Sequence, residues 1–150
     1  MWQSCKNEDH LLYPKTGNCL KCEKYINYEQ TECIEEIPDG FYLKNTYYGI
    51  IEKCNEYCSK CSKGPSSRSM NCDYCIEGYY LRIDDINIKN CFPIDTIIPS
   101  NYVEKEPNIY IKCYHACGSC FKEGDHNNMN CLTCIDDALY NYDSVNKNWI

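Results

Sequence analysis

Cysteine is the residue that most constrains this chain, because fifteen of its 150 residues are Cys. A tenth of the chain is the density at which small secreted proteins are held together by disulfides. Proteins of a reducing compartment reach this density when their thiolates ligate a metal ion. Two classes therefore compete from the start, a disulfide framework and a zinc protein.

The hydrophobic residues are too few to form a core of ordinary size. The hydrophobic fraction of 43% counts fifteen Cys and fifteen Tyr, whereas only three Phe, three Met and two Trp are present. Ordering a backbone costs roughly 1–2 kcal/mol per residue, and a disulfide that closes a loop of about 15 residues returns about 3 kcal/mol. We therefore expect covalent cross-links to supply the order that an apolar interior would otherwise give.

The charge pattern excludes several kinds of partner. The formal net charge is −7, and the fifteen Lys and Arg stand singly along the chain. Nucleic acids and anionic lipids attract basic clusters, so we expect no nucleic-acid partner and no insertion of this segment into a membrane. No stretch approaches the roughly 18 apolar residues of a membrane span, and residues 1–4 do not begin a signal peptide. We expect a segment of a longer protein.

The Cys pattern repeats with a fixed period. Five Cys of one segment recur after 59 residues. The residues next to them recur as well, as in Met70-Asn71-Cys72 and Met129-Asn130-Cys131. The five are Cys54, Cys58, Cys61, Cys72 and Cys75, which return as Cys113, Cys117, Cys120, Cys131 and Cys134. A shorter copy with Cys5, Cys19, Cys22 and Cys33 precedes them. The predicted units are 1–53, 54–112 and 113–150, the last cut short.

The residues between the Cys predict short strands and loops. No segment carries a sustained helical period of apolar residues. Residues 41–44 and 79–83 are rich in aromatic and branched side chains, which favours strands, and residues 64–67 and 124–128 are turn sequences. The predicted fold is small and disulfide-rich, with tandem cysteine-rich repeats of short strands and loops stacked as an elongated rod and with little helix.

A zinc protein is the alternative. Two C-x2-C pairs in each of two repeats could build a tetrahedral four-thiolate site. The candidate ligands are Cys58, Cys61, Cys72 and Cys75, and Cys117, Cys120, Cys131 and Cys134. Such sites would leave Cys54 and Cys91 unused, and the first copy lacks the first C-x2-C pair. Basic residues are also sparse around these pairs. These observations favour disulfides.

The second repeat resembles a known extracellular module. The run Cys54-x3-Cys58-x2-Cys61, then Lys63-Gly64-Pro65 and Asn71-Cys72-x2-Cys75-x2-Gly78-Tyr79-Tyr80, is similar to the furin-like cysteine-rich repeat. That repeat occurs in growth-factor-receptor cysteine-rich domains, in furin-type proprotein convertases and in large protozoan surface proteins. The similarity is best over residues 54–91 and 113–134 and looser over 5–42, and the spacing from Cys75 to Cys91 is longer than usual.

The resemblance implies a disulfide pairing, which spacing alone would leave open among many. The six Cys of a full family unit pair first with third, second with fourth and fifth with sixth. Carried over by position, the pairs are Cys5–Cys19, Cys22–Cys33, Cys54–Cys61, Cys58–Cys72, Cys75–Cys91, Cys113–Cys120 and Cys117–Cys131. Cys134 is left over, and the 59-residue period places its expected partner just past Ile150.

The His residues and the acidic turns are the remaining candidates for catalysis or metal binding, and each is better explained as an ordinary loop or surface residue. His115 stands between Cys113 and Cys117, but a Cys nucleophile must be a free thiol of low pKa, and both neighbours are expected in disulfides. We interpret His10 and His126 as loop residues. Acidic turns at Asp84-Asp85-x-Asn87 and Asp136-Asp137 offer oxygens to calcium but lack the spacing of an EF-hand. We expect no cofactor and no catalysis.

Aromatic pairs are the most informative feature besides Cys. Tyr47-Tyr48, Tyr79-Tyr80 and Phe41-Tyr42 predict rings laid over disulfides, because flat aromatic side chains bury the most area in a module without a deep core. Exposure at an interface, where Tyr is enriched, is the other interpretation.

These features together predict an extracellular segment of a larger surface receptor, adhesin or antigen. It would act as a rigid spacer and as a protein-interaction module for other chains or subunits of a surface assembly. The alternative is a structural zinc protein with two four-Cys sites in a reducing compartment. An enzyme with Cys chemistry is a third class, which would require free thiols beyond Cys134.

Overall fold

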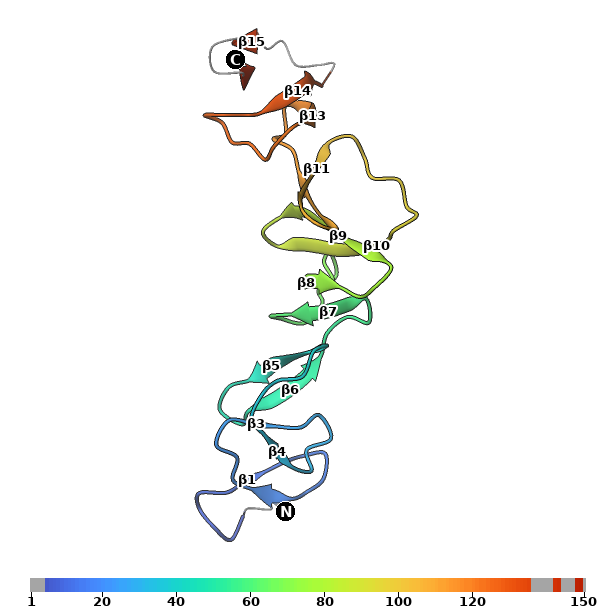
Figure 1. Cartoon of the computed structure of the whole chain (residues 1–150). Coiled ribbons are helices and arrows are strands. Elements are labelled where there is room, and N and C mark those ends of the chain that lie inside the picture. Colours follow the sequence, from blue (N-terminus) through green and yellow to red (C-terminus); the bar gives the residue numbers. More distant parts are fainter. Residues whose placement is uncertain (1–4, 136–141, 144–147, 150) are drawn as a thin grey trace. The chain divides into compact units, whose positions relative to one another are not determined.

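The computed structural model describes residues 5–135, 142–143 and 148–149. It contains sixteen short strands, and no helix is present in these residues. Figure 1 shows the strands as short arrows joined by loops. The prediction of a small disulfide-rich fold of short strands is confirmed, and the predicted strands at 41–44 and 79–83 correspond to β5 (Phe41–Asn45) and β9 (Tyr79–Asp85).

The chain divides into two compact units, Met1–Tyr74 and Cys75–Ile150. This division follows the packing of the chain rather than the Cys period. It therefore does not test the three predicted repeats, 1–53, 54–112 and 113–150, and the stacking of these repeats as a rod also stays a prediction.

The first unit contains a four-stranded sheet with the order β4-β3-β6-β5. Its strands are β3 (Tyr25–Ile26), β4 (Cys33–Ile34), β5 and β6 (Ile50–Lys53). Two antiparallel hairpins, β3–β4 and β5–β6, meet through a parallel contact in which Ile26 lies opposite Ile50. Ile26 and Ile51 are buried, so this junction forms the apolar centre of the unit.

The second unit contains the same sheet again, with the order β10-β9-β12-β11. The further strands are β10 (Ile88–Pro93), β11 (Tyr102–Glu106) and β12 (Ile109–Lys112). Here the parallel contact places Leu81 of β9 opposite Ile109, 59 residues after Ile50. The sequence duplication is thus also a duplication of topology.

A backbone position with positive φ recurs in both sheets. Gly49 (φ 64°) and Asn108 (φ 62°) precede the last strand of their sheets. Their carbonyls accept hydrogen bonds from the N–H groups of Ile26 (3.0 Å) and Leu81 (2.8 Å). A Cβ on Gly49 would lie 2.4 Å from the carbonyl oxygen of Lys24, so the first copy requires glycine at this position.

The remaining strands form two-stranded sheets. They are β1 (Leu11–Leu12) with β2 (Cys19–Leu20), β7 (Cys58–Cys61) with β8 (Cys72–Cys75), β13 (Cys117–Cys120) with β14 (Cys131–Cys134), and β15 (Tyr142–Asp143) with β16 (Asn148–Trp149). We call the β7–β8 and β13–β14 pairs the two knuckles. Cys residues begin and end every knuckle strand, so these small sheets are the scaffold of the cross-links.

Half-cystines make up most of the buried apolar material. Eight of the fourteen buried hydrophobic residues in the described chain are Cys, and they are Cys54, Cys58, Cys72, Cys91, Cys113, Cys117, Cys120 and Cys131. Tyr13 and Tyr80 are the largest fully buried side chains. Tyr80 contacts Phe92 and Tyr110 at ring-centroid distances of 5.9 and 5.5 Å. Sulfur and aromatic rings thus take the place of an aliphatic core.

The aromatic pairs divide between the two interpretations. Tyr80 is buried, as the packing interpretation predicts, and its ring contacts are with Phe92 and Tyr110, whereas Tyr47 is 75% exposed at the turn between β5 and β6. The packing prediction is wrong for Tyr47, whose ring is mostly exposed and meets the Tyr48 ring edge-on, with centroids 5.0 Å apart.

Candidate functional site

The described structure contains seven disulfides. They join Cys5 to Cys19, Cys22 to Cys33, Cys54 to Cys61, Cys58 to Cys72, Cys75 to Cys91, Cys113 to Cys120, and Cys117 to Cys131. These are the pairs that the furin-like resemblance implies. Their Cα–Cα distances lie between 5.0 and 6.0 Å, within the usual range for a disulfide.

The candidate zinc ligands are not gathered in fours. Cys58 is bonded to Cys72, whereas Cys61 is bonded to Cys54 outside the candidate set, and Cys75 is bonded to Cys91. The third repeat divides its candidates in the same way, with Cys117 bonded to Cys131 and Cys120 to Cys113. Over the residues that the structure describes, no group of three or more His, Cys, Asp or Glu side chains is placed to hold a metal ion.

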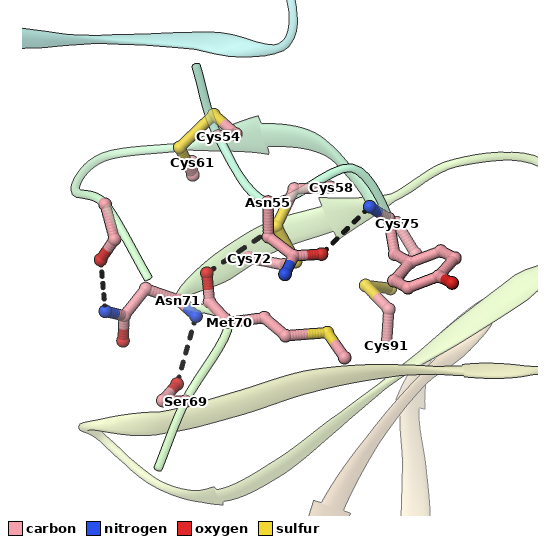
Figure 2. Close-up of a disulfide and its surroundings, with 12 residues drawn as sticks. Cys54, Asn55, Cys58, Cys61, Ser69, Met70, Asn71, Cys72, Cys75 and Cys91 are labelled. Atoms are coloured by element: carbon pink, nitrogen blue, oxygen red, sulfur yellow. Dashed lines mark hydrogen bonds between the residues drawn. A yellow bond between two sulfur atoms is a disulfide. The ribbon is translucent and has the colours of Figure 1, made fainter. Parts of the chain in front are cut away.

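The loop inside each knuckle is held by an asparagine in the left-handed region. Asn71 has φ 56° and its side chain is buried against the loop (Figure 2). Its Nδ2 donates to the carbonyl oxygen of Gly64 at 2.6 Å, and its own backbone N–H bonds to the hydroxyl of Ser69 at 3.0 Å. Asn tolerates positive φ better than other residues with a side chain, which explains its place directly before Cys72.

The same hydrogen bonds recur 59 residues later. Asn130 has φ 57° and donates from Nδ2 to the carbonyl oxygen of Glu123 at 2.7 Å. The backbone N–H of Asp125 bonds to the carbonyl of Asn128 at 2.9 Å, as the N–H of Ser66 does to that of Ser69 at 2.8 Å. The second copy of the knuckle loop therefore keeps the hydrogen bonds of the first, while the exposed side chains of the loop differ between the two copies.

Cys134 is the cysteine without a disulfide partner among the described residues. It is half-buried, and burial raises the pKa of its thiol above the ordinary value. In the β13–β14 ladder it lies opposite Cys117, whose sulfur is bonded to Cys131. A raised pKa lowers the thiolate fraction at neutral pH, which is the reverse of what a nucleophilic Cys requires.

The histidines lie in surface positions. The His10 ring nitrogen Nδ1 is 3.0 Å from the Asp9 carboxylate, and the His115 ring lies over Tyr114 with centroids 4.1 Å apart. His126 is exposed in the loop that Asp125 holds by accepting the N–H groups of Asn127 and Asn128. These backbone bonds, first that of Asn128, lower the pKa of Asp125.

The acidic turn at Asp84 and Asp85, which sequence analysis weighed as a calcium site and set aside, forms hydrogen bonds of its own. Asp85 accepts the backbone N–H of Asn87 at 2.6 Å, and Asp84 accepts the phenol of Tyr102. Asp136 and Asp137, the other acidic pair, lie outside the described residues.

A cation between two rings is a feature that sequence reasoning missed. The Arg82 guanidinium lies 4.5 Å from the ring centroids of both Phe92 and Tyr102. Its Nη2 is 3.3 Å from the Tyr102 hydroxyl, which in turn bonds to Asp84. Burial, and next the bond to Asp84, raise the pKa of Tyr102. Because these residues come from three different strands, no local motif could have predicted the cluster.

Each unit has a groove between an edge strand and a knuckle. In the first unit the groove measures about 450 Å³ and lies between β5 and the turn that follows β7. Its lining residues are Ile37, Pro38, Asp39, Gly40, Phe41, Tyr42, Leu43, Lys60, Cys61, Ser62 and Asp73. A smaller groove of about 230 Å³ lies beside β11 in the second unit and is lined by Val103, Glu104, Lys105, Ile111, Phe121, Lys122 and Glu123.

Comparison of this chain with family models, with curated proteins and with solved structures finds no match. The resemblance to the furin-like repeat therefore rests on the residues quoted for it. Among the described residues there is also no helix with the length and apolar character needed to cross a membrane.

Proposed function

We propose that this chain is an extracellular segment of a larger surface protein, a receptor, adhesin or antigen, and serves as a spacer and protein-interaction module. The observation that carries the proposal is the replacement of an aliphatic core by seven disulfides. Such a module keeps its structure only where disulfides persist, which is outside the cell or in the secretory pathway.

One further feature supports a role in interaction. Large apolar side chains stand exposed on both units, among them Tyr47, Ile97 and Leu132 at 75%, 88% and 61%. Exposed apolar side chains mark surfaces that bind other proteins where they gather into a contiguous patch, and Tyr is enriched among the residues that carry binding energy. The zinc protein of a reducing compartment is the competing proposal, and it requires the eight candidate thiols to be reduced.

Surface labelling tests the proposed location. An antibody raised against the folded chain should stain intact cells that express the native protein, and external trypsin should remove the stain. Staining that appears only after permeabilisation, with a cytosolic pattern, would contradict the proposal. Metal analysis of the native protein distinguishes the zinc alternative, for which about two zinc ions per chain are expected, one for each four-thiolate site.

A further inference from the structure

The loop that joins β10 to β11 is longer than its counterpart in the first unit. Pro99 follows Cys91 by eight residues, whereas Pro38 follows Cys33 by five. The two prolines are equivalent, because the carbonyl of each accepts the backbone N–H three residues later. Figure 1 shows the longer loop as the yellow connection that leads from β10 to β11.

This longer loop presents apolar side chains to solvent. Ile94 is 60% exposed and Ile97 is 88% exposed. The backbone around them is held by hydrogen bonds. The N–H of Ile94 donates to the carbonyl of Gly78 at 2.9 Å, and that of Thr96 donates to Pro93, also at 2.9 Å. Burial of these side chains against another molecule would therefore remove apolar surface from water with little further cost in loop entropy.

The groove beside β11 in the same unit has an apolar wall on the side of the knuckle. Its apolar lining residues are Val103, Ile111 and Phe121. Phe121 is 49% exposed, and Leu132 on β14 is 61% exposed. In the first knuckle their positions hold Ser62 and Asp73, which are joined by a hydrogen bond of 2.6 Å. The repeat thus places Phe121 and Leu132 side by side.

The size and charge of this groove suit a side chain of another protein. Its volume of about 230 Å³ is below the roughly 300–1,000 Å³ of small-molecule sites. Two Lys and two Glu line it, so its formal charge is zero. Lys105 is paired with Glu123 at 3.3 Å, and Glu104 accepts the phenol of Tyr110 at 2.7 Å. Lys122 has no ion pair or hydrogen bond within the described part of the chain.

A second copy of this chain carries a side chain that fits. The whole chain has a formal charge of −7, so two copies repel each other except where their surfaces are nearly neutral. Residues 94–98 carry a single charge, that of Asp95, which has no ion pair or hydrogen bond among the described residues. Lys122 offers the opposite charge. Because Ile97 is 88% exposed, the loop does not fill the groove of its own chain.

The first unit supports this match by contrast. Its shorter loop carries the acidic Glu35 and Glu36, and its knuckle carries the polar Ser62 and Asp73. The loop and the knuckle wall are therefore both apolar in the second unit and both polar in the first, as expected for two surfaces that meet.

We propose that copies of this chain associate through their second units, with Ile97 of one copy inserted beside Phe121 of the next and Asp95 placed against Lys122. The inference rests on the proposed role as an interaction module and specifies a second copy as the partner. Loop and groove belong to the same unit, so one pair of copies can form the contact twice. The interface is small, and we expect association at about 0.1 mM or above.

Sedimentation equilibrium of the oxidised chain tests this association. Every sample carries Cys134→Ser, so that no intermolecular disulfide forms at the unpaired thiol. We expect the average mass to rise above that of the monomer between about 20 µM and about 500 µM chain. Ile97→Asp should lower the association constant at least about tenfold, because the burial of one Ile is lost. The matched control is Ile86→Asp in the turn between β9 and β10, where Ile86 is 81% exposed; it adds the same charge and should leave the constant unchanged.

Exchanged charges test the pairing of loop and groove. Asp95→Lys and Lys122→Asp should each lower the association constant about threefold to fivefold, and the double variant should return to within about twofold of the unaltered pair. Intact masses before and after reduction check that each variant keeps its seven disulfides.

Three results would overturn the proposed contact. They are a chain that stays monomeric at about 500 µM, an equal loss of association in Ile86→Asp and Ile97→Asp, and a double variant no stronger than the single ones. None of these results bears on the extracellular placement, which surface labelling decides separately.

Discussion

Asn71 and Asn130 occupy the same position in two copies of one repeat, and each donates its side-chain amide to a carbonyl seven residues earlier, at 2.6 and 2.7 Å. Both have φ near +57° and both are buried. One residue type thus satisfies two requirements of the knuckle loop, a left-handed backbone and a buried hydrogen bond.

Substitution of Asn71 separates these two requirements. Asn71→Gly keeps the backbone conformation but loses the bond to Gly64, and should lower the free energy of unfolding by about 1 kcal/mol. Asn71→Ala also forces a Cβ into the left-handed region and should cost about 1–2 kcal/mol more. Guanidinium unfolding of the oxidised chain measures both values. Equal losses for Gly and Ala would contradict the backbone part of this explanation.

Tyr80 offers a test of the aromatic core. Its ring is 1% exposed, and its hydroxyl has no hydrogen-bond partner among the described residues. Tyr80→Phe should therefore be neutral or slightly stabilising, whereas Tyr80→Ala should cost about 3–5 kcal/mol because it opens a cavity beside Phe92 and Tyr110. Thermal unfolding of the oxidised chain compares the two variants. A large loss for Tyr80→Phe would show that the hydroxyl has a polar role.

Asp9 should titrate at unusually low pH. The Lys21 ammonium, 2.9 Å away, and next the hydrogen bond with His10 lower the pKa of Asp9 from 3.8 to about 2. A depressed carboxylate pKa stabilises the folded state above the unfolded value of 3.8, and this contribution is lost as the pH falls toward 2. NMR titration of the Asp9 carboxyl should show the low midpoint in the wild type and a higher one in Lys21→Met.

A matched variant controls for the loss of a positive charge. Lys24 pairs with Glu35 at 3.2 Å, away from Asp9, so Lys24→Met should leave the Asp9 midpoint unchanged. If the Asp9 midpoint rose equally in both variants, the low pKa would come from the total positive charge of the chain and not from the contact with Lys21.

Exposure predicts the order in which the disulfides are reduced. Cys33 and Cys19 are exposed, whereas Cys58 and Cys72 are 4% and 0% exposed. Limited reduction by a phosphine at low pH, followed by alkylation and peptide mapping, should open Cys22–Cys33 and Cys5–Cys19 first and Cys58–Cys72 last. The same maps check the pairing. Early labelling of Cys72, or peptides joined in other pairs, would contradict the structure.

The sequence predicted the fold class well because the Cys period and the strand composition are local signals. Residues 41–44 and 79–83 carry their preference for strands in their own side chains. The parallel contacts of Ile26 with Ile50 and of Leu81 with Ile109 were not predictable, because each joins short strands that belong to two different hairpins.

Less of the candidate site than of the fold could be predicted from the sequence. Tyr47 and Tyr80 stand in similar aromatic pairs, yet one is exposed and the other buried, because only the tertiary position of the turn and the strand distinguishes them. The Arg82 cluster and the groove beside β5 arise where distant segments meet. The disulfide pairing was implied by the resemblance, since Cys spacing alone permits many connectivities.

The claim that sulfur–sulfur bonds hold this chain together is tested most directly on the 150-residue chain itself, purified without reductant, by alkylating it under denaturing conditions, before and after reduction, and weighing it intact. The structure predicts one alkylated cysteine before reduction, Cys134, and fifteen after it, because fourteen are paired. Most of the fifteen thiols reacting without reduction, above all together with bound zinc, would contradict the account.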